Sequence, residues 1–399
     1  LYLDYGKQDG QWVPNKYGGK ENLEAIELFK HLNTLICGRN KGVAMIAEES
    51  TAWPKVTGNV AEDGLHFTYK WNMGWMHDFL EYVKLDPYFK KNNHNKMTFG
   101  LTYAFSENFI LVLSHDEVVH LKCSMINKMP GYPSDKFKNL KTAYTFMMGH
   151  PGRKLLFMGQ EYGQVHEWAE NKALDWEDLE KPAHRQMQNY TKALIQLYKT
   201  HPALWKLDYD PDGFEWINCV EWEKSMVTFL RKSKKQEDTL VVICNFSDVA
   251  YEEELVGVPY AGKYKEILNS DAKEYGGTGV VNPRVKIAKK EETDDRPYTI
   301  KVKVAPLSVA IYSFTKTAAK TSTNRTAKTA KKTAGKAERK MLSASEKKEG
   351  LRKVIQQKLE TAEKKGAEEK EKRTAKEAEA AKKPKEKKTE TAKKETKTE

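Results

Sequence analysis

Two apolar segments of this chain each end abruptly in carboxylate residues. Residues 43–47 run directly into Glu48, and residues 109–113 are followed within three positions by His115 and Asp116. Because short apolar runs of this kind are typical of buried strands, both carboxylates would lie at the carboxyl end of a strand, where barrel enzymes carry their chemistry. Cleavage or transfer of a glycosidic bond requires two carboxyl groups facing one sugar. We therefore expect Glu48 and Asp116 to converge on one sugar-sized cleft.

Each motif also has a simpler interpretation. A lone glutamate at a strand end, such as Glu48, is more often a solvated loop carboxylate. An aspartate after a strand, such as Asp116, is often a helix N-cap, and its histidine neighbour can be structural. Neither motif establishes a site when taken alone, and only their combination favours one.

The formal charge of +12 is unevenly distributed. Residues 316–399 hold 28 Lys and Arg against 14 Asp and Glu, a charge of +14 that leaves −2 for residues 1–315. This tail lacks the interleaved aromatic residues that stack on bases, so its composition is more typical of a solvated polyampholyte than of a nucleic-acid-binding arm. We expect the tail to be disordered, or to form at most one isolated short helix within 343–372.

Several other classes of protein are disfavoured. No apolar run approaches the roughly 20 residues of a membrane helix, so no membrane partner is expected. The four cysteines have no CxxC spacing, which disfavours a metal site or a disulfide framework and favours a reducing cytoplasm. The chain begins at Leu1 rather than Met and shows no signal-peptide pattern, so we interpret it as a fragment whose amino-terminal part is missing.

The order of expected elements divides the chain into three parts. Residues 1–204 alternate short strands with longer helices, which predicts a parallel α/β fold. Only four such strands are present, so we expect the second half of a (β/α)8 TIM-type barrel. Residues 205–315 predict an antiparallel β-sandwich, and residues 316–399 form the tail. The expected helices are 21–35, 135–148 and 183–199; the expected strands are 43–47, 65–69, 109–113 and 154–158, then 225–231, 239–246, 263–269, 298–304 and 309–314.

Six motifs follow one another along the first half of the chain. They are WVPNKYGGKEN (12–22), AEESTAWP (47–54), KWNMGWMHD (70–78), LSHDEVVH (113–120), LLFMGQEYGQ (155–164) and ALDW (173–176). This series resembles the 1,4-α-glucan branching enzymes of the α-amylase superfamily, and the resemblance covers about residues 1–315. The order of the motifs is specific to branching enzymes rather than to amylases in general.

The resemblance implies a role for each matching residue. Glu48 matches the general acid/base, Asp116 the transition-state stabiliser and His115 the histidine that contacts the sugar. Trp53 and Glu117 are further candidates for substrate binding, since flat sugar faces suit aromatic rings. Three other tryptophans could also stack on sugars, but packing is the commoner fate of a tryptophan, so we expect at most one or two ligands among Trp53, Trp71, Trp75 and Trp168.

The family's nucleophilic aspartate has no match in this chain, because its motif would lie upstream of Leu1. Asp4 belongs to the loop that follows the nucleophile in the resemblance. Glu49 is expected to tune or structure the site, although Glu49 as the acid remains an alternative. The chemistry requires no metal and no organic cofactor.

The function that the resemblance implies is a retaining transglycosylation in glycogen biosynthesis, which cleaves α-1,4 links and forms α-1,6 branches. Its partner would be an α-1,4-glucan or glycogen. Two alternatives stay open: an α-glucan hydrolase of the same superfamily, and a non-catalytic fragment that binds glucan or a polyanion. Because half a barrel leaves strand edges unpaired, we expect this chain alone to be inactive and poorly folded without the missing amino-terminal half of the same protein.

Overall fold

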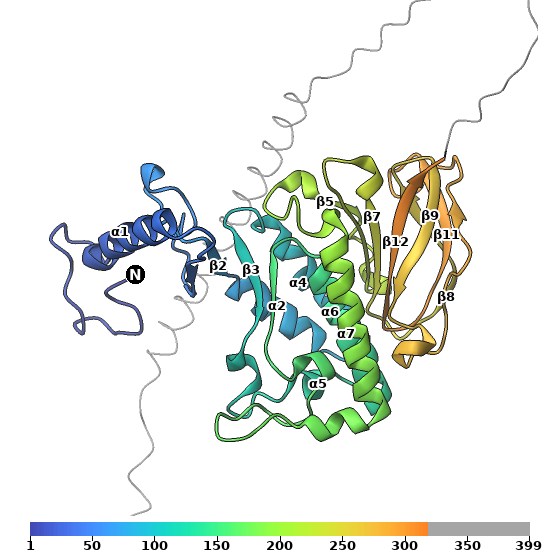
Figure 1. The fold of residues 1–399 in the computed structure, drawn as a ribbon, viewed down its shortest axis with the longest axis horizontal. Coiled ribbons are helices and arrows are strands. Elements are labelled where there is room, and N and C mark those ends of the chain that lie inside the picture. Colours follow the sequence, from blue (N-terminus) through green and yellow to red (C-terminus); the bar gives the residue numbers. More distant parts are fainter. Residues whose placement is uncertain (318–399) are drawn as a thin grey trace, which may run out of the picture. The chain divides into compact units, whose positions relative to one another are not determined.

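A computed structural model describes residues 1–317 of the chain (Figure 1). The short helix expected within 343–372, and all of the basic tail except its first two residues, lie outside the described part. Within residues 1–317, a parallel sheet with its helices comes first and antiparallel sheets follow.

The parallel sheet has four strands in chain order. All neighbouring pairs are parallel, and the sheet order is β1 (Ile46–Ala47), β2 (Tyr69–Trp71), β3 (Phe109–Leu113) and β4 (Arg153–Leu156). The expected strand 109–113 coincides with β3, whose five apolar residues are all buried. The other three strands are shorter than the expected ones or shifted along the sequence. The expected strand 65–69 was wrong except at its last residue, because residues 65–68 approach the sheet as an irregular segment.

Four longer helices accompany this sheet, and three of them overlap the expected ones. Asn22 and Asn72 cap two of these helices by accepting the backbone N–H groups of Ala25 and Trp75. The four helices are α1 (Leu23–Arg39), α2 (Met73–Val83), α6 (Pro133–Gly149) and α7 (Pro182–Thr200); the short helices are α3 (Pro87–Lys90), α4 (Asn95–Thr98) and α5 (Met125–Lys128).

Helix α2 was not among the expected helices. Its signal was present, because the asparagine cap is followed by buried residues at helical spacing, namely Trp75, Met76, Phe79, Leu80 and Val83. Trp75 is core and stacks on Phe79 with 4.6 Å between ring centroids, so it is not a sugar platform.

The antiparallel part consists of two sheets that share one core. Six strands lie in the order β10-β9-β12-β7-β6-β5, and β11 pairs with β8 in a second sheet. Apolar residues of both sheets form one buried cluster, which agrees with the expected sandwich. The strands are β5 (Phe214–Asn218), β6 (Met226–Arg231), β7 (Leu240–Asn245), β8 (Tyr251–Val258), β9 (Gly262–Asn269), β10 (Lys286–Ile287), β11 (Tyr298–Val304) and β12 (Ser308–Lys316).

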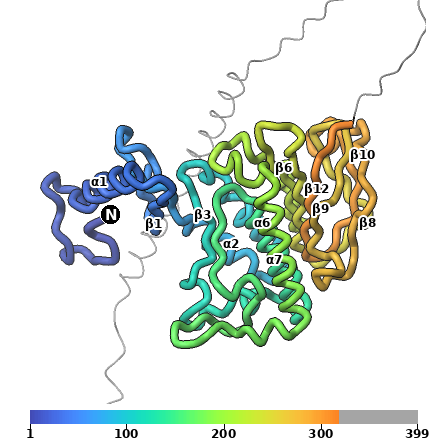
Figure 2. Tube along the Cα trace, in the orientation of Figure 1, coloured from blue at the N-terminus to red at the C-terminus, as the bar shows by residue number. Residues whose placement is uncertain are grey.

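Helix α6 joins the parallel and antiparallel parts. Figure 2 shows α6 and α7 between β3 and the antiparallel strands. All of the last eleven residues of α6 are buried, and Phe146 contacts Phe79 on one side and Phe229 of β6 on the other. The two parts therefore share a continuous apolar core.

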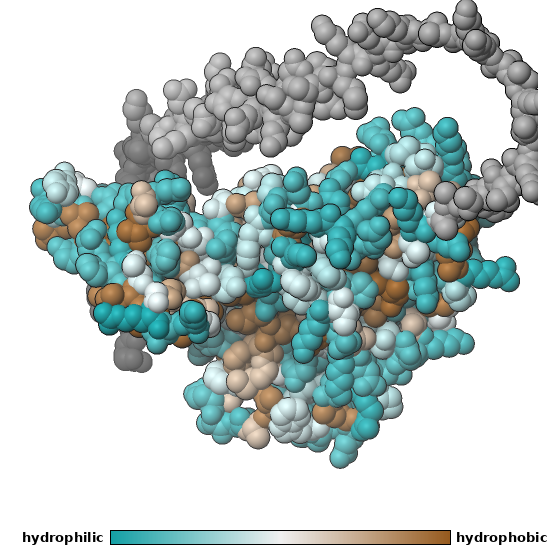
Figure 3. Space-filling view, turned by 45° about the horizontal axis from the view of Figure 1, so that its top comes forward, coloured by the Kyte–Doolittle hydropathy of each residue, from teal (hydrophilic) through white to brown (hydrophobic). Residues whose placement is uncertain are grey.

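The outer strands of the parallel sheet are less covered than its centre. All four residues of β4 are only half-buried, and Ile46 of β1 is 48% exposed. Parallel strands are normally covered on both faces. Apolar side chains reach the surface among polar ones on the face seen in Figure 3. Four parallel strands agree with the expected α/β fold, whereas their assignment to half of a TIM-type barrel remains a prediction.

A buried arginine connects β6 to the helical layer. Arg231 is fully buried and donates to the carbonyl oxygens of Gly149 at 2.7 Å, Leu204 at 3.2 Å and Gly213 at 3.1 Å. Its guanidinium also lies 2.9 Å from the buried carboxylate of Asp208. The three carbonyl acceptors end helix α6 and two short 3-10 helices, so one side chain holds several segments together.

Replacing Arg231 with Met should lower the free energy of unfolding by about 3–5 kcal/mol, because the buried Asp208 would lose the nearer of its two arginine partners, keeping only Arg153 at 3.5 Å, and three carbonyl groups would lose their donor. Chemical denaturation of the full chain measures this loss. The matched control is Lys301→Met, since Lys301 forms an exposed pair with Glu253, and that change should cost at most about 1 kcal/mol. Equal losses in the two variants would contradict the role of the buried pair.

Lys141 makes a second link between the two parts. Its ammonium group is buried and donates to the carbonyl oxygens of Ser270 at 2.8 Å and Tyr275 at 2.7 Å. Burial lowers the pKa of Lys141 from 10.5 to about 8. Between these two values the unfolded chain binds more protons than the folded chain, so the contribution of Lys141 to stability increases as the pH rises.

The wild type should become more stable relative to Lys141→Met as the pH rises. We expect the difference between their free energies of unfolding to change by roughly 1 kcal/mol per pH unit from pH 8 to pH 10. Urea unfolding at pH 7.5, 8.5 and 9.5 tests this dependence. A difference that stays constant across the three pH values would show that the pKa of Lys141 is not lowered.

Candidate active site

The parallel strands direct the candidate residues to one edge of the sheet. Glu48 follows β1 directly, and His115 and Asp116 follow β3 after one intervening residue. Since β1, β2 and β3 run parallel, the residues after each strand lie at the same carboxyl edge. The structure thus places both candidate carboxylates at the carboxyl edge of the parallel sheet.

The register of the sheet sets how the two carboxylates lie along the strands. Ala47 pairs with Lys70, and Lys70 pairs with Phe109. Glu48 is one position past this line, whereas Asp116 is seven positions past it. Strand β2 also lies between the two, and neighbouring strands are about 4.8 Å apart. Their convergence on one sugar-sized cleft therefore stays a prediction.

Glu48 is exposed and lines a groove of about 720 Å³, here called the Glu48 groove. The hydroxyl groups of Tyr5 and Ser50, two residues that line this groove, lie 3.1 Å apart. Glu49 accepts the backbone N–H of Thr51 at 2.8 Å within the same loop, and its role in the site stays a prediction. The groove is lined by Leu1, Tyr2, Leu3, Tyr5, Lys7, Asn22, Glu48, Glu49, Ser50, Thr51 and Met73.

His115 and Asp116 begin a short 3-10 helix that ends at Val118. The Nε2 atom of His115 lies 3.2 Å from Oδ1 of Asp116. Glu117 is half-buried in the same turn, and its backbone N–H donates to the carbonyl of Ser114 at 3.3 Å. The structure therefore brings His115, Asp116 and Glu117 together in one turn, and the histidine can orient the aspartate.

Two aromatic rings flank the imidazole of His115. The ring centroids of Phe157 and Trp168 lie 5.9 and 6.2 Å from that of His115, and 5.3 Å from each other. The backbone N–H of Trp168 donates to the carbonyl of Val118 at 3.0 Å. Trp168 is thus a candidate tryptophan that lies beside the turn of His115. The sequence-based prediction gave Phe157 no role.

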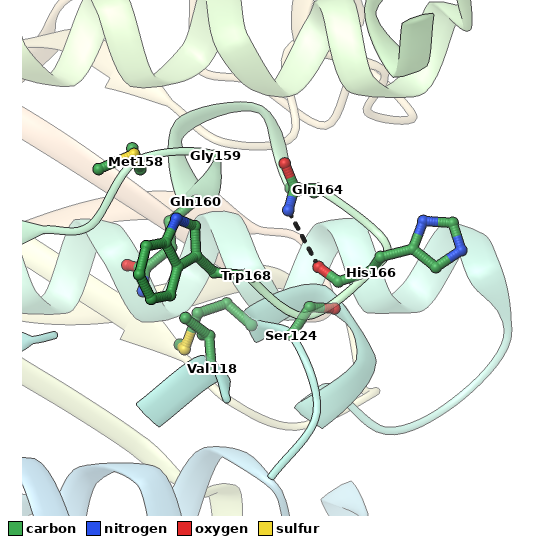
Figure 4. Close-up of a pocket in the computed structure, with 10 residues that line it drawn as sticks. Val118, Ser124, Met158, Gly159, Gln160, Gln164, His166 and Trp168 are labelled. Atoms are coloured by element: carbon green, nitrogen blue, oxygen red, sulfur yellow. Dashed lines mark hydrogen bonds between the residues drawn. The ribbon is translucent and has the colours of Figure 1, made fainter. Parts of the chain in front are cut away.

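Trp168 also lines a small pocket formed by the loops after β3 and β4 (Figure 4). In that pocket the side-chain amide of Gln164 donates to the carbonyl of His166 at 3.2 Å. The amide of Gln160 donates to the carbonyl of Leu113 at 3.2 Å, which connects the loop after β4 to the end of β3. Hydrogen bonds within the loops thus fix the aromatic wall of the His115 turn.

Trp53 and Glu48 line different grooves. Its ring makes an edge contact with Tyr2, with 4.9 Å between the centroids, and lines a neighbouring groove. The Glu48 groove is lined by neither His115 nor Asp116. The structure therefore groups the candidates as His115, Asp116 and Glu117 on one turn, with Glu48 and Trp53 on the loop after β1.

The backbone after Asp116 adopts an unusual turn. His120, Leu121 and Cys123 all have left-handed backbone angles, with φ of 55°, 65° and 69°. The carboxylate of Glu167 accepts the backbone N–H of Leu121 at 3.0 Å and that of Cys123 at 2.6 Å. Left-handed conformations cost roughly 1 kcal/mol or more at non-glycine residues, so these bonds offset strain beside the candidate site.

Replacing Glu167 with Ala should speed amide hydrogen exchange at Leu121 and Cys123 by about tenfold or more, because both N–H groups lose their acceptor. Exchange of the peptide spanning 119–124, followed by mass spectrometry, measures this effect. The exposed neighbour Glu170 accepts neither of these hydrogen bonds, so Glu170→Ala is the control. Equal exchange in the two variants would show that Glu167 does not hold the turn.

Within residues 1–317, the structure shows no group of three or more His, Cys, Asp or Glu side chains placed to hold a metal ion. A helix with the length and apolar sequence needed to span a bilayer does not occur among the described residues.

Comparison with known proteins identifies relatives of both parts. Residues 216–315 match the model of the α-amylase C-terminal all-β domain. The chain is 51% identical over 314 residues to the 1,4-alpha-glucan branching enzyme GlgB of Butyrivibrio fibrisolvens, covering 79% of this chain and 49% of that protein. It is 48% identical over 312 residues to GlgB of Halothermothrix orenii, covering 78% of this chain and 50% of that protein. The chain thus spans about half the length of these curated relatives.

One solved structure supports the fold. The α-amylase of Geobacillus thermoleovorans superposes with a TM-score of 0.51 and 12% identity, covering 73% of this chain and 57% of that chain. At this identity the similarity concerns the fold alone.

Proposed function

We propose, from the premise that this chain belongs to the 1,4-α-glucan branching enzymes of the α-amylase superfamily, that it acts in building branched glucan. The reaction would cut an α-1,4 link and transfer the released segment to a 6-hydroxyl group, giving an α-1,6 branch. The observation that carries the proposal is about 50% identity to proteins of that name over some 310 residues. Its setting would be glycogen biosynthesis in the cytoplasm.

Glu48 would act as the general acid and then as the base. It would first protonate the departing glycosidic oxygen and later take the proton of the incoming 6-hydroxyl. Its exposed position in the Glu48 groove supports access to a sugar. A retaining mechanism also needs a carboxylate that attacks the anomeric carbon. The family resemblance does not assign this role to any residue of this chain.

Asp116 would stabilise the positive charge that develops at the anomeric carbon. A fixed carboxylate does this well when its orientation is set before the reaction. The contact with His115 at 3.2 Å, and the rings of Phe157 and Trp168 beside that histidine, support such a fixed orientation. His115 and Glu117 would contact hydroxyl groups of the bound sugar.

The parallel sheet would be half of a (β/α)8 barrel within a domain spanning 1–204, with an all-β domain over 205–315. The half-buried β4 and the exposed Ile46 of β1 support further strands on both sides of the sheet. The relatives are about twice as long as the matched segment, which is enough chain for four more strand–helix units. Closing the barrel would also fix the relation of Glu48 to Asp116.

A chimera tests the proposed function. The matching segment of the Butyrivibrio enzyme is replaced with the matching residues of this chain, and the product is assayed with amylose. We expect the iodine spectrum to change without release of reducing sugar. Glu48→Gln and Asp116→Asn in the chimera should each reduce branching by about a thousandfold or more, because each removes a group that acts in the transition state.

Glu49→Gln serves as the matched control, since it removes the neighbouring carboxylate and should retain most of the activity. Release of reducing sugar without branching would favour the α-glucan hydrolase instead. Full activity of the Glu48→Gln chimera, or loss of activity only in Glu49→Gln, would contradict the assignment of the acid.

A further inference from the structure

Residues 120–123 form an exposed turn that follows the 3-10 helix of Asp116, and we call it the 120–123 turn. Three of its four residues have left-handed backbone angles, although none is a glycine. Leu121 is 95% exposed, so burial of its apolar side chain does not stabilise the turn. Left-handed conformations are unfavourable at such residues and persist only where surrounding contacts impose them. Polar contacts must therefore hold this turn in place.

The side chain of Glu167 supplies two of these contacts. One of its carboxylate oxygens accepts the backbone N–H of Leu121 at 3.0 Å, and the other accepts that of Cys123 at 2.6 Å. Glu167 belongs to residues 165–168 in the loop after β4, which we call the clamp segment. Because both oxygens are used, a single side chain fixes two positions of the 120–123 turn.

The clamp segment also contacts the chain before and after the 120–123 turn. The backbone N–H of Trp168 donates at 3.0 Å to the carbonyl of Val118, the last residue of the 3-10 helix that holds Asp116. The carbonyl of Val165 accepts the hydroxyl of Ser124 at 2.7 Å. Four consecutive residues thus hold the end of the 3-10 helix, the turn and the residue that follows it.

A buried lysine makes a further contact with the 120–123 turn. Lys128 of α5 is only 8% exposed, and its ammonium group donates to the carbonyl of Lys122. The carboxylates of Glu117 and Glu167 both act on this ammonium group electrostatically. One of these glutamates lies in the candidate site and the other in the clamp segment, so Lys128 connects the two.

We propose that Glu167 is a positioning residue, which sets the orientation of Asp116 by holding the 120–123 turn together with Lys128. The proposal rests on the proposed function, because it takes Asp116 to stabilise the charge of the transition state. A carboxylate does this effectively only when its direction is fixed before the reaction. A displacement of about 1 Å can cost roughly a hundredfold in rate, so loss of the clamp would be visible in the kinetics.

The kinetics of the chimera test this proposal. Glu167→Ala should lower kcat for branching of amylose by about ten- to a hundredfold and change KM by less than about threefold, because Asp116 acts in the transition state. Glu167→Gln should lose less, since its carbonyl oxygen can still accept an N–H group. The exposed Glu170 accepts neither hydrogen bond of the turn, so Glu170→Ala is the matched control and should equal the unmodified chimera.

Lys128→Met gives a second, independent variant. It removes the donor to Lys122 and keeps a side chain of similar length, so kcat should fall in the same way. Thermal melting of each chimera measures its folded fraction. A loss of kcat that only follows the unfolded fraction would overturn the proposal.

Hydrogen exchange of the 399-residue chain provides a readout that does not require activity. In Glu167→Ala, the peptide spanning 113–118 should exchange faster than in the wild type, because release of the 120–123 turn loosens the 3-10 helix before it. Wild-type exchange over 113–118 would overturn the proposal, even if residues 119–124 exchange faster.

The chimera also separates this proposal from the proposed function. Unchanged kcat in both Glu167→Ala and Lys128→Met, or a loss confined to KM, would overturn the positioning role and leave the branching function intact. An unmodified chimera that does not branch amylose would contradict the proposed function instead.

Discussion

The burial of strand β3 is the constraint on which most of the structure depends. Its five residues, Phe109–Leu113, are all removed from water, and the strand pairs with β2 on one side and β4 on the other. Helix α2 packs against it, and the same core continues through Phe146 of α6 to Phe229 in β6. Because apolar burial is the main favourable term in folding, this strand fixes where the polar turn at His115 must emerge.

Directional polar contacts complete what apolar packing begins. Arg231 and Lys141 both reach from one part of the chain to backbone carbonyls of the other, where an unmet acceptor would be costly. Near the candidate site the same principle holds the loops, since Glu167 and Gln160 bond to the backbone of neighbouring segments. Buried polar contacts thus join the two parts of the chain, and hydrogen bonds hold the loops around the candidate site.

The loop after β1 borders two grooves at the carboxyl edge of the sheet. Glu48 lines one of them, Trp53 lines the other, and Ser50 and Thr51 line both. Neither His115 nor Asp116 lines either groove, so the relation of Glu48 to that turn depends on the rest of the barrel that we propose.

The sequence by itself determined the elements with strong local signals and the identity of the candidate residues. Five consecutive apolar residues specified β3, and the neighbouring positions of His115 and Asp116 already placed them in one turn. Helix α2 was readable from its asparagine cap and apolar spacing, but was missed. Only the tertiary structure decided contacts between distant positions, such as Arg231 with Gly149 or Glu167 with Cys123, and the register that relates Glu48 to Asp116. These depend on how strands and loops pack in three dimensions, which no local pattern of residues encodes.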